Sequence, residues 1–490
     1  MRIAVAEGDG IGPEIMAAVL RLFREAGLPL ELVPVEMGMR AYQAGHSTGM
    51  TEEARRIVED VGILFKGPME TPKGGGLKSV NVTARKLWST YANKRIFKTL
   101  PGVDTVFSRA GIPIDLTFVR ENIEDTYGGI EHMQTHDVAQ CRRMISRPGS
   151  LQVHRYAFEV AKRKGARKIT CAHKANIMKM TDGLFLEAFR EVAADYPELE
   201  AEDLIVDDLA MKLVTRPDRF EVIVLPNLQG DILSDLAAGL VGGLGFAPSA
   251  NVGEHVAIFE AVHGTAPDLA GKGIANPTAL LLSGCILLRH LGFFDHAAWI
   301  EGALHEALWD GCRTADVAGR KPPLSTEEFV DAILVRMRRR DAPAPGPLDR
   351  VLYVPPVRPR TQPVLETPKR VEETVVGMDV FVESHVPPNE LAAKVQLALP
   401  PDVRLVMISN RGTQVWPTAS IFTECVNHFR LRVVASKERA ISVDRLLEVA
   451  QLLGPVARIC SLEMLITLGD KAGFSLAQGQ ASGPVVAAVA

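Results

Sequence analysis

Short apolar runs alternate with amphipathic stretches over roughly the first 335 residues of the chain. Residues 2–6 form a short apolar run of the kind that favours a buried strand. An amphipathic stretch follows at 13–26, with Pro13 in its first turn and Gly27 at its end, which predicts a helix. Such alternation predicts an α/β fold with a substantial sheet. The same order of a strand followed by a helix recurs at 168–172 with 182–194 and at 221–225 with 231–241.

Proline is concentrated between residues 339 and 370, where eight prolines occur. This composition predicts an extended, semi-rigid linker between two folded parts. Beyond the linker, residues 371–480 contain both strand-like and helix-like runs, which predict a separate, small α+β domain. The expected strands are 378–382, 404–408 and 430–434, the expected helices are 389–399 and 443–453, and 458–467 fits either.

Composition narrows the classes of function. The 490 residues carry 55 Lys and Arg against 59 Asp and Glu, so nothing favours nucleic acid or a membrane surface as a partner. An apolar share of 47% fits a globular protein with a sizeable core. No uncharged apolar run reaches the length of about 18 residues that suggests a membrane span, and no secretory leader is recognisable. The six cysteines lack metal-type spacing, so we expect free thiols and a cytoplasmic location.

Two aspartates within residues 227–235 are candidate metal ligands. Asp231 and Asp235 are four residues apart, after a predicted strand, and therefore share one face of a helix expected to begin near Asp231. Hard cations such as Mg²⁺ prefer oxygen ligands and bind one or two carboxylates. A simpler interpretation is that Asp231 caps the helix and Asp235 is solvated. The motif alone leaves both open.

A polar stretch after residue 70 offers groups that fit an anionic substrate. Arginine binds a carboxylate through two parallel hydrogen bonds, so several arginines together fit a substrate with several carboxylates. Taken singly, each arginine fits a surface ion pair better. The stretch and the segments after it contain Thr71, Ser79, Asn81, Arg85, Arg95 and Arg120.

Tyr127 and Lys174 are candidate proton carriers. Tyr127 ends a polar run at 119–127, and Lys174 lies directly after a predicted strand. Each can transfer a proton where neighbouring charges lower its pKa. Considered alone, a core tyrosine and a surface lysine are the better explanation.

The glycine-rich turn after residue 6 argues against a Rossmann fold. Gly8, Gly10 and Gly12 have the spacing G-x-G-x-G, whereas the dinucleotide-binding fingerprint is G-x-G-x-x-G. They indicate a tight turn in which the backbone approaches another segment closely. A later loop at 263–267 offers backbone N–H groups of the kind that bind phosphates, although alone it is unremarkable.

Together, in this order and spacing, these segments resemble the β-decarboxylating dehydrogenases, the family of isocitrate, homoisocitrate, 3-isopropylmalate and tartrate dehydrogenases. The resemblance covers about residues 1–335 and is most specific at 227–235 and 242–245. It implies an isopropylmalate-dehydrogenase-like α/β fold of two domains with a clasp, which is not a Rossmann fold. It also implies a homodimer whose active sites borrow residues from the partner subunit. The expected large domain is 1–90 with 242–338, and the small domain is 91–241 with the clasp at about 125–147.

The resemblance further implies roles for single residues. Asp231 and Asp235 would bind Mg²⁺ or Mn²⁺, and Asp207 would complete that site from the second subunit. Tyr127, with Lys174 of the partner subunit, would form the acid–base pair. The substrate-binding residues would be Thr71, Ser79, Asn81, Arg85, Arg95 and Arg120, and the cofactor-binding residues would be Asn176, Glu260, His263, Gly264, Thr265, Ala266, Asp268, Leu269 and Asn276.

Ser79 and Asn81 favour isocitrate as the substrate. In isocitrate dehydrogenases a serine and an asparagine meet the distal carboxylate, whereas isopropylmalate enzymes present an apolar face there. A polar pair disfavours an isopropyl group, because its hydrogen bonds would go unmade. We therefore expect oxidative decarboxylation of isocitrate to 2-oxoglutarate and CO₂, a step of the tricarboxylic acid cycle. Homoisocitrate is the alternative substrate.

Asp268 favours NAD as the cofactor. NADP-linked relatives carry a Lys-Tyr pair at the positions of Asp268 and Leu269, and often a tyrosine and an arginine where this chain has Ala315 and Gly319. A carboxylate accepts a hydrogen bond from a ribose 2′-hydroxyl but repels a 2′-phosphate. Like charges about 4 Å apart repel by a few kcal/mol at an effective dielectric of about 20. NADP is the alternative, and Asp268 as a helix cap is the simpler interpretation.

The C-terminal region resembles the extension of long-chain bacterial isocitrate dehydrogenases of the Thermus type. The likeness lies at 377–383 and 406–413, and in that group the extension helps to hold the dimer together. Its better-known members are NADP-linked, which counts against NAD here. A non-catalytic regulatory subunit is an alternative of a different class. Such chains lose catalytic or metal residues, but Tyr127, Lys174, Asp207, Asp231 and Asp235 are all present.

Overall fold

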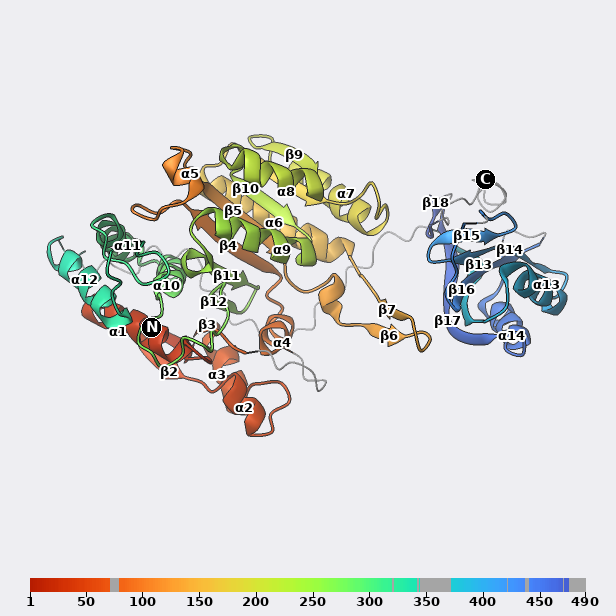
Figure 1. Cartoon of the computed structure of the whole chain (residues 1–490), viewed down its shortest axis with the longest axis horizontal. Coiled ribbons are helices and arrows are strands. Elements are labelled where there is room, and N and C mark those ends of the chain that lie inside the picture. The colour runs from red at the N-terminus through yellow and green to blue at the C-terminus, as the bar shows by residue number, and fades with distance from the viewer. Residues whose placement is uncertain are drawn as a thin grey trace. The chain divides into compact units, whose positions relative to one another are not determined.

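The computed structural model describes residues 1–70, 79–319, 321–341, 343, 372–420, 422–436, 440–469 and 471–475. These residues form two compact units (Figure 1). The first contains 1–128 and the described residues from 143 to 343, and the second contains 129–142 and the described residues from 372 onward. Thr71 and most of the predicted linker at 339–370 lie outside the described residues.

A mixed ten-stranded sheet forms the centre of the described first unit. Two parallel groups of strands flank an antiparallel middle, which distinguishes this sheet from the parallel Rossmann sheet. In spatial order the strands are β2 (Glu31–Pro34), β1 (Arg2–Ala6), β3 (Ile63–Lys66), β12 (Ala257–Ala261), β11 (Pro248–Val252), β4 (Ala92–Lys98), β5 (Asp115–Glu121), β10 (Val222–Leu225), β8 (Lys168–His173) and β9 (Glu200–Ile205).

Helices pack against this sheet through apolar stripes (Figure 1). In α1 (Gly12–Glu25), Ile15, Val19 and Leu22 recur at helical spacing and are fully buried. The other helices of the unit are α2 (Met39–Gln43), α3 (Glu52–Val61), α4 (Val80–Leu87), α5 (Val106–Arg109), α6 (Arg147–Lys164), α7 (Thr181–Ala193), α8 (Val206–Thr215), α9 (Asn227–Leu240), α10 (Thr278–His290), α11 (Phe294–Trp309) and α12 (Thr326–Arg338), with the short turns η1 (Thr126–Gly128), η2 (Pro217–Arg219) and η3 (Leu244–Phe246).

Helix ends follow local sequence signals. Before α6, the Ser146 hydroxyl accepts a hydrogen bond from the Gly149 backbone N–H, and Gly165 ends the helix in the left-handed conformation. In contrast, α9 begins at Asn227, directly after β10. The expected start near Asp231 was therefore four residues late. Asp231 lies inside the helix, so the interpretation of this aspartate as a cap does not hold.

The glycine turn after β1 is a close backbone crossing. Gly8 and Gly10 have positive φ values of 78° and 60°. A Cβ on Gly8 would lie 2.2 Å from the Pro68 carbonyl oxygen, and one on Gly10 would lie 2.1 Å from that of Thr265. The Ile11 N–H donates to the same Thr265 oxygen at 2.9 Å. Only glycine fits these positions, and they bring the turn against the loop after β12.

The second unit contains a six-stranded antiparallel sheet among its described residues. Alternate residues Met378, Val380 and Val382 of its central strand are fully buried against the two helices. Residues 458–467, left open between strand and helix, form a strand. The order is β15 (Thr413–Trp416), β14 (Val403–Asn410), β16 (His428–Ala435), β13 (Glu373–Glu383), β17 (Arg458–Leu468) and β18 (Lys471–Ala472), with helices α13 (Pro388–Ala398) and α14 (Val443–Leu453).

A hairpin of β6 (Glu131–Met133) and β7 (Ala139–Cys141) belongs to this second unit. Arg458 donates to the Gln134 carbonyl oxygen at 2.7 Å, and Arg142 pairs with Glu463 at 2.8 Å. The hairpin therefore groups with the C-terminal residues, although it lies inside the predicted clasp at 125–147. The boundary between the predicted large and small domains stays a prediction.

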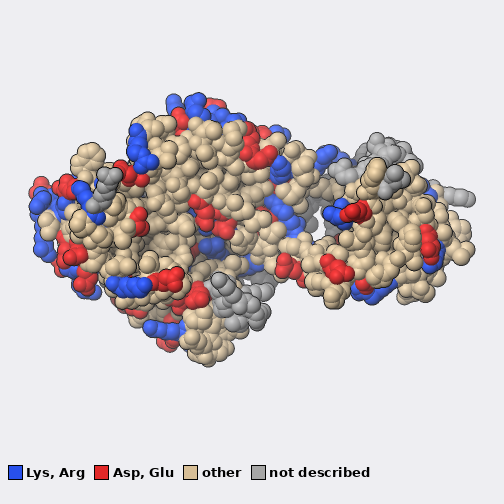
Figure 2. Space-filling model, in the orientation of Figure 1, with Lys and Arg blue, Asp and Glu red and all other residues tan. Residues whose placement is uncertain are grey.

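The surface shows no one-sign charge field on the face drawn in Figure 2, where basic and acidic side chains are interspersed. Among the described residues, none of the helices combines the length and the apolar character needed to cross a membrane.

Candidate active site

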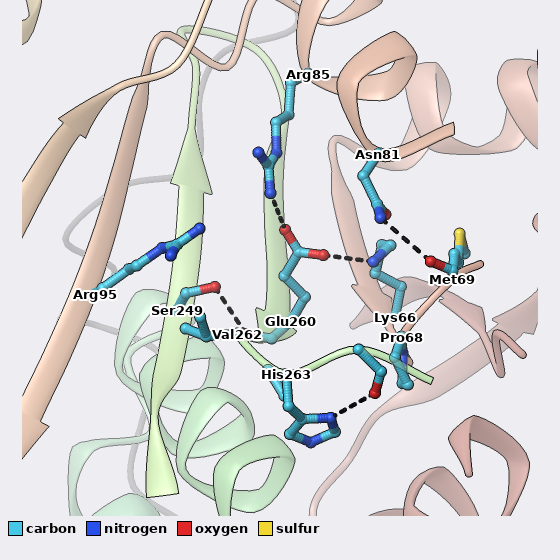
Figure 3. Close-up of a pocket in the computed structure, with 12 residues that line it drawn as sticks. Lys66, Pro68, Met69, Asn81, Arg85, Arg95, Ser249, Glu260, Val262 and His263 are labelled. Atoms are coloured by element: carbon cyan, nitrogen blue, oxygen red, sulfur yellow. Dashed lines mark hydrogen bonds and ion pairs between the residues drawn. The ribbon is translucent and has the colours of Figure 1, made fainter. Parts of the chain in front are cut away.

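A pocket of about 110 Å³ lies at the middle of the large sheet. Strands β3, β4, β11 and β12 each place a polar side chain in its wall, so the pocket draws on both the first and the later part of the unit (Figure 3). Its lining residues are Lys66, Pro68, Met69, Asn81, Arg85, Arg95, Ser249, Glu260, Ala261, Val262, His263 and Gly264.

Glu260 is the anionic centre of this pocket. Its carboxylate is ion-paired with Lys66, and it accepts hydrogen bonds from Arg85 at 3.1 Å and Asn251 at 2.7 Å. Figure 3 shows Arg85 and Lys66 both pointing at this carboxylate. Burial alone would raise the pKa of Glu260, but the two cations outweigh it and hold the pKa far below its usual value. Glu260 therefore stays ionised and fixes both cations.

Three buried polar atoms in the pocket lining have no hydrogen-bond partner among the described residues: Asn81 Oδ1, Arg85 Nε and His263 Nε2. Buried polar groups are nearly always paired, because leaving one unpaired costs about 1–3 kcal/mol. Two of the three residues are predicted substrate-binding residues, and the third belongs to the predicted cofactor loop. The pocket wall can therefore form hydrogen bonds with polar groups of a ligand.

A second group of residues, here the Tyr127–Asp231 cluster, comprises Arg95, Arg120, Tyr127 and Asp231. The Tyr127 hydroxyl donates to Asp231 Oδ2 at 2.5 Å, and Arg120 is ion-paired with Oδ1. Arg95 Nη2 lies 3.3 Å from the same Oδ1. The guanidinium carbon of Arg120 lies 4.8 Å from the centre of the Tyr127 ring. Residues from β4, β5, η1 and α9 are brought together here.

Charge inside this cluster sets the protonation states. Burial alone would raise the pKa of Asp231, but Arg120 and Arg95 outweigh it and lower that pKa. Burial, with the hydrogen bond to Asp231, raises the pKa of Tyr127. Burial and the neighbouring arginines lower the pKa of Arg120 to about 9. At neutral pH the cluster therefore contains an ionised aspartate and a protonated tyrosine, which suits a proton donor.

Asp231 and Asp235 are the predicted metal ligands. They lie one turn apart on α9, and the side chain of Asp235 is 58% exposed. Burial raises the pKa of Asp235, although Arg95 opposes this. Among the described residues of this single chain, no group of three His, Cys, Asp or Glu side chains converges as a metal site. Two carboxylates fit a hard divalent cation, which takes further oxygen ligands from water or substrate.

Lys174 and Asp207 form a separate Lys174–Asp207 pair. The Lys174 amine lies 2.5 Å from Asp207 Oδ1, and the Asp207 side chain is 68% exposed. The hydrogen bond from Lys174 lowers the pKa of Asp207. The structure brings these two predicted residues together, but within the described residues no hydrogen bond or ion pair joins them to Tyr127, Asp231 or Asp235.

Only some of the predicted cofactor-binding residues are brought together in the structure. His263 shares a hydrogen bond at 2.9 Å with the Gly264 carbonyl oxygen, and Ala266 has a positive φ of 40°. The Asn276 amide donates to Asp316 at 2.8 Å. Thr265 contacts the glycine turn through its carbonyl oxygen. Asp268, Leu269 and Asn176 are exposed. Ser79 directly precedes α4, which carries Asn81 and Arg85.

Lys66, Ser249 and Asn251 are site residues that sequence reasoning missed. Lys66 is 2% exposed and ends the otherwise apolar strand β3, and a lysine at the end of a buried strand is a signal that was available. Asn251 is fully buried beside Glu260. Its partner is only nine residues away, but β11 and β12 must first pair for the two to meet.

Family models account for both parts of the chain. Residues 2–333 match the model described as isocitrate/isopropylmalate dehydrogenase. The chain belongs to this family. Residues 373–480 match the model of the bacterial isocitrate dehydrogenase C-terminal domain. The recognised family and its C-terminal extension are thereby confirmed.

Relatives of this family member match over nearly its full length. "Isocitrate dehydrogenase [NADP]" of Thermus thermophilus is 44% identical over 98% of this chain and 96% of its own. The Rickettsia bellii protein of the same name is 38% identical over 98% and 99%. A solved structure of a Thermus thermophilus protein superposes with a TM-score of 0.89 at 43% identity, covering 98% of this chain and 96% of its own. The predicted fold is confirmed.

The expectation of NAD is contradicted by these comparisons, because both of these relatives bear the name NADP. That expectation depended on the charge of Asp268. The structure shows Asp268 exposed in the turn after Pro267. Water and salt screen an exposed carboxylate, and its side chain can turn toward solvent, so its charge alone does not select the cofactor.

Proposed function

We propose that this chain is an NADP-dependent isocitrate dehydrogenase, which converts isocitrate and NADP⁺ to 2-oxoglutarate, CO₂ and NADPH. The observation that carries the proposal is 44% identity over 98% of the chain with a relative named "Isocitrate dehydrogenase [NADP]". The arginine-rich pocket and its unpartnered polar atoms support a substrate with several carboxylates.

Substrate binding is assigned to residues around the pocket. Arg85, Arg95 and Arg120 supply the positive charge for the carboxylates, and Ser79 and Asn81 bind the distal one. Thr71 lies outside the described residues, and its role in substrate binding rests on the family resemblance alone. Asn81 supports this role because its Oδ1 is buried and lacks a partner among the described residues. Arg95 and Arg120 are 5% and 1% exposed, so they are held rigidly before substrate arrives.

Asp231 and Asp235 would hold Mg²⁺ or Mn²⁺, together with Asp207 of the partner subunit. The exposed position of Asp207 supports its reaching a second chain. A bound cation supplies Lewis-acid polarisation of the substrate's 2-hydroxyl and the adjacent carboxylate. Because Asp231 is paired with Arg120 in this chain, it would exchange that partner when cation and substrate bind.

Two side chains would move the protons. The partner subunit's Lys174, in its neutral form, accepts the proton of the 2-hydroxyl as C2 gives up its hydride, which NADP⁺ accepts. The bond between C3 and the β-carboxylate then breaks and CO₂ leaves. The electron pair of that bond stays on the substrate, which becomes an enolate. Tyr127 donates its hydroxyl proton to C3 and completes 2-oxoglutarate. The raised pKa of Tyr127 keeps this proton in place at neutral pH.

The loop from His263 to Ala266 would line the cofactor pocket, together with Glu260, Asn276 and Asn176. Gly264 is exposed, and no heavy atom lies within 4 Å of the position that a Cβ would take there. A phosphate can therefore approach its backbone N–H. Asp268 and Leu269 would lie at the edge of this pocket. A homodimer follows from the proposal, since Tyr127 and Lys174 do not meet in one chain.

The test is an assay of the purified full chain with isocitrate, Mg²⁺ and either NADP⁺ or NAD⁺. We expect isocitrate-dependent formation of NADPH and 2-oxoglutarate, with a higher kcat/KM for NADP⁺ than for NAD⁺. Homoisocitrate and 3-isopropylmalate serve as comparison substrates and should react far more slowly. Absence of isocitrate turnover, or a preference for NAD⁺, would refute the proposal.

A further inference from the structure

Arg143 lies between two carboxylates that are completely buried. Its Nε lies 2.6 Å from Asp125 Oδ1, and its Nη1 is ion-paired with Asp182 Oδ1. Both aspartate side chains have no exposed surface, whereas that of Arg143 is 16% exposed. One guanidinium therefore pairs with two buried carboxylates, and backbone N–H groups supply their other hydrogen bonds.

Both aspartates also hold the backbone of segments that carry proposed site residues. Asp182 Oδ2 accepts from the Lys174 N–H at 2.6 Å. Asp125 Oδ2 accepts from the Leu228 N–H at 3.0 Å, at the start of the helix that carries Asp231. Asp125 Oδ1 also accepts from the N–H of Thr126, next to Tyr127, at 2.8 Å.

Asp125 is held in an uncommon backbone conformation by these contacts. Its φ is 64°, in the left-handed region, and its N–H donates to the Met144 carbonyl oxygen at 2.9 Å. Aspartate adopts this region more readily than most residues, but it persists here because the surroundings fix it. The turn at Asp125 therefore sets the position of the backbone at Tyr127.

We propose that Arg143 is a positioning residue that fixes Tyr127 and Lys174 together, through Asp125 and Asp182. The inference rests on the proposed function, in which Tyr127 acts in its own subunit and Lys174 acts in the partner subunit. Arg143 bonds to neither the Tyr127 hydroxyl nor the Lys174 amine, which pair with Asp231 and Asp207. One partly buried arginine thereby links the two active sites of the dimer.

The test uses two reactions that need different groups. Full turnover of isocitrate needs both Tyr127 and Lys174. Exchange of the C3 protons of 2-oxoglutarate with deuterated solvent, in the presence of NADPH and Mg²⁺, needs Tyr127 but no hydride transfer. The variants are Arg143→Lys, Asp182→Asn and Asp125→Asn. The control is Arg142→Met, which changes the neighbouring, 44% exposed arginine.

Lysine keeps the charge of Arg143 but lacks the planar guanidinium whose Nε and Nη1 contact the two aspartates at fixed spacing. For Arg143→Lys we expect kcat and the exchange rate each to fall by about tenfold or more, because small displacements of reacting groups have effects of this size. The KM for isocitrate should change by less than about threefold, since the substrate arginines are untouched. Arg142→Met should match the wild type in both reactions.

The two aspartate variants separate positioning from general damage. Asp182→Asn should lower turnover and spare the exchange, whereas Asp125→Asn should lower both. Equal losses in both reactions for both variants, or an Arg143→Lys variant with near-normal kcat, would overturn the inference. The aspartate variants decide the matter if Arg143→Lys does not fold. Lack of isocitrate turnover by the wild type would instead refute the proposed function itself.

Discussion

The two proposed proton carriers lie in very different surroundings. Tyr127 is part of the Tyr127–Asp231 cluster, where Arg95 and Arg120 are 5% and 1% exposed and every charge has a partner. Among the described residues, the Lys174 amine pairs with Asp207, whose side chain is 68% exposed. The ion pairs of the first region form within one chain. The second presents its groups at the surface.

This difference indicates which contacts a single chain can supply. A cluster of buried charges is stable only if its own fold neutralises it, so it must be built within one subunit. A partly exposed lysine and an exposed aspartate contribute little to stability, and they can serve a neighbouring chain. The comparison predicts that a substitution in the first region lowers both stability and activity. A substitution in the second region should lower activity and leave stability nearly unchanged.

The largest effect is expected for Lys174→Met. Loss of a proton acceptor lowers kcat by roughly 10²–10⁴-fold. The free energy of unfolding should change by less than about 0.5 kcal/mol, because the side chain lies at the surface. Steady-state kinetics and urea unfolding measure the two quantities. Lys212→Met is a matched control, since Lys212 is 27% exposed and also pairs with an aspartate of α8 at 2.5 Å. Near-normal turnover of Lys174→Met would reject its role.

Arg120→Met should damage both activity and stability. It leaves the partly buried Asp231 carboxylate without its main partner, and breaking such a pair costs about 3–5 kcal/mol when both charges are buried. Asp231 is 37% exposed, so we expect the lower end of that range. The KM for isocitrate should also rise. Arg289→Met, which removes a half-buried arginine that pairs with Glu301, should leave KM unchanged. Unaltered unfolding by urea would contradict the described packing.

The pH dependence of stability in the Glu260→Gln variant tests the ion pairs of the buried pocket. The folded-state pKa of Glu260 lies below its unfolded value of about 4.3, because Lys66 and Arg85 outweigh the effect of burial. The stability that this carboxylate contributes is therefore complete above that pH and is lost as pH falls toward the folded-state pKa. The stability difference between wild type and variant should shrink by up to about 1.4 kcal/mol per pH unit below about pH 4.3. A difference independent of pH would contradict the ion pairs.

The smallest effect is expected for Asp268→Asn. An exposed carboxylate that water screens should change kcat/KM for NADP⁺ by less than about threefold. Kinetics with NADP⁺ at low and moderate salt provide the measurement. A tenfold or larger gain would show that Asp268 faces the 2′-phosphate after all.

Local patterns predicted much of the fold and part of the site. The spacing of Asp231 and Asp235 correctly placed both on one helix, because helical periodicity is a local property. The strand–helix order of the first unit and the α+β composition of the C-terminal part were likewise readable. Residues 458–467 were ambiguous, since only their pairing with β13 makes them a strand.

Contacts between distant segments were beyond local reasoning. Tyr127 and Asp231 are 104 positions apart, and nothing in their own segments predicts a hydrogen bond between them. The family resemblance implied that they share a site but gave no geometry. The NAD expectation failed for a related reason, since the charge of Asp268 was known from the sequence but its exposure was not.

Subunit complementation tests most directly whether Tyr127 and Lys174 act from different chains. Tyr127→Phe and Lys174→Met homodimers are each expected to be nearly inactive. When the two are unfolded and refolded together in equal amounts, half of the dimers are mixed, and each mixed dimer has one intact site. About a quarter of wild-type activity should therefore return. If the mixture stays as inactive as its components, although mixed dimers have formed, the two residues do not act across the subunit interface.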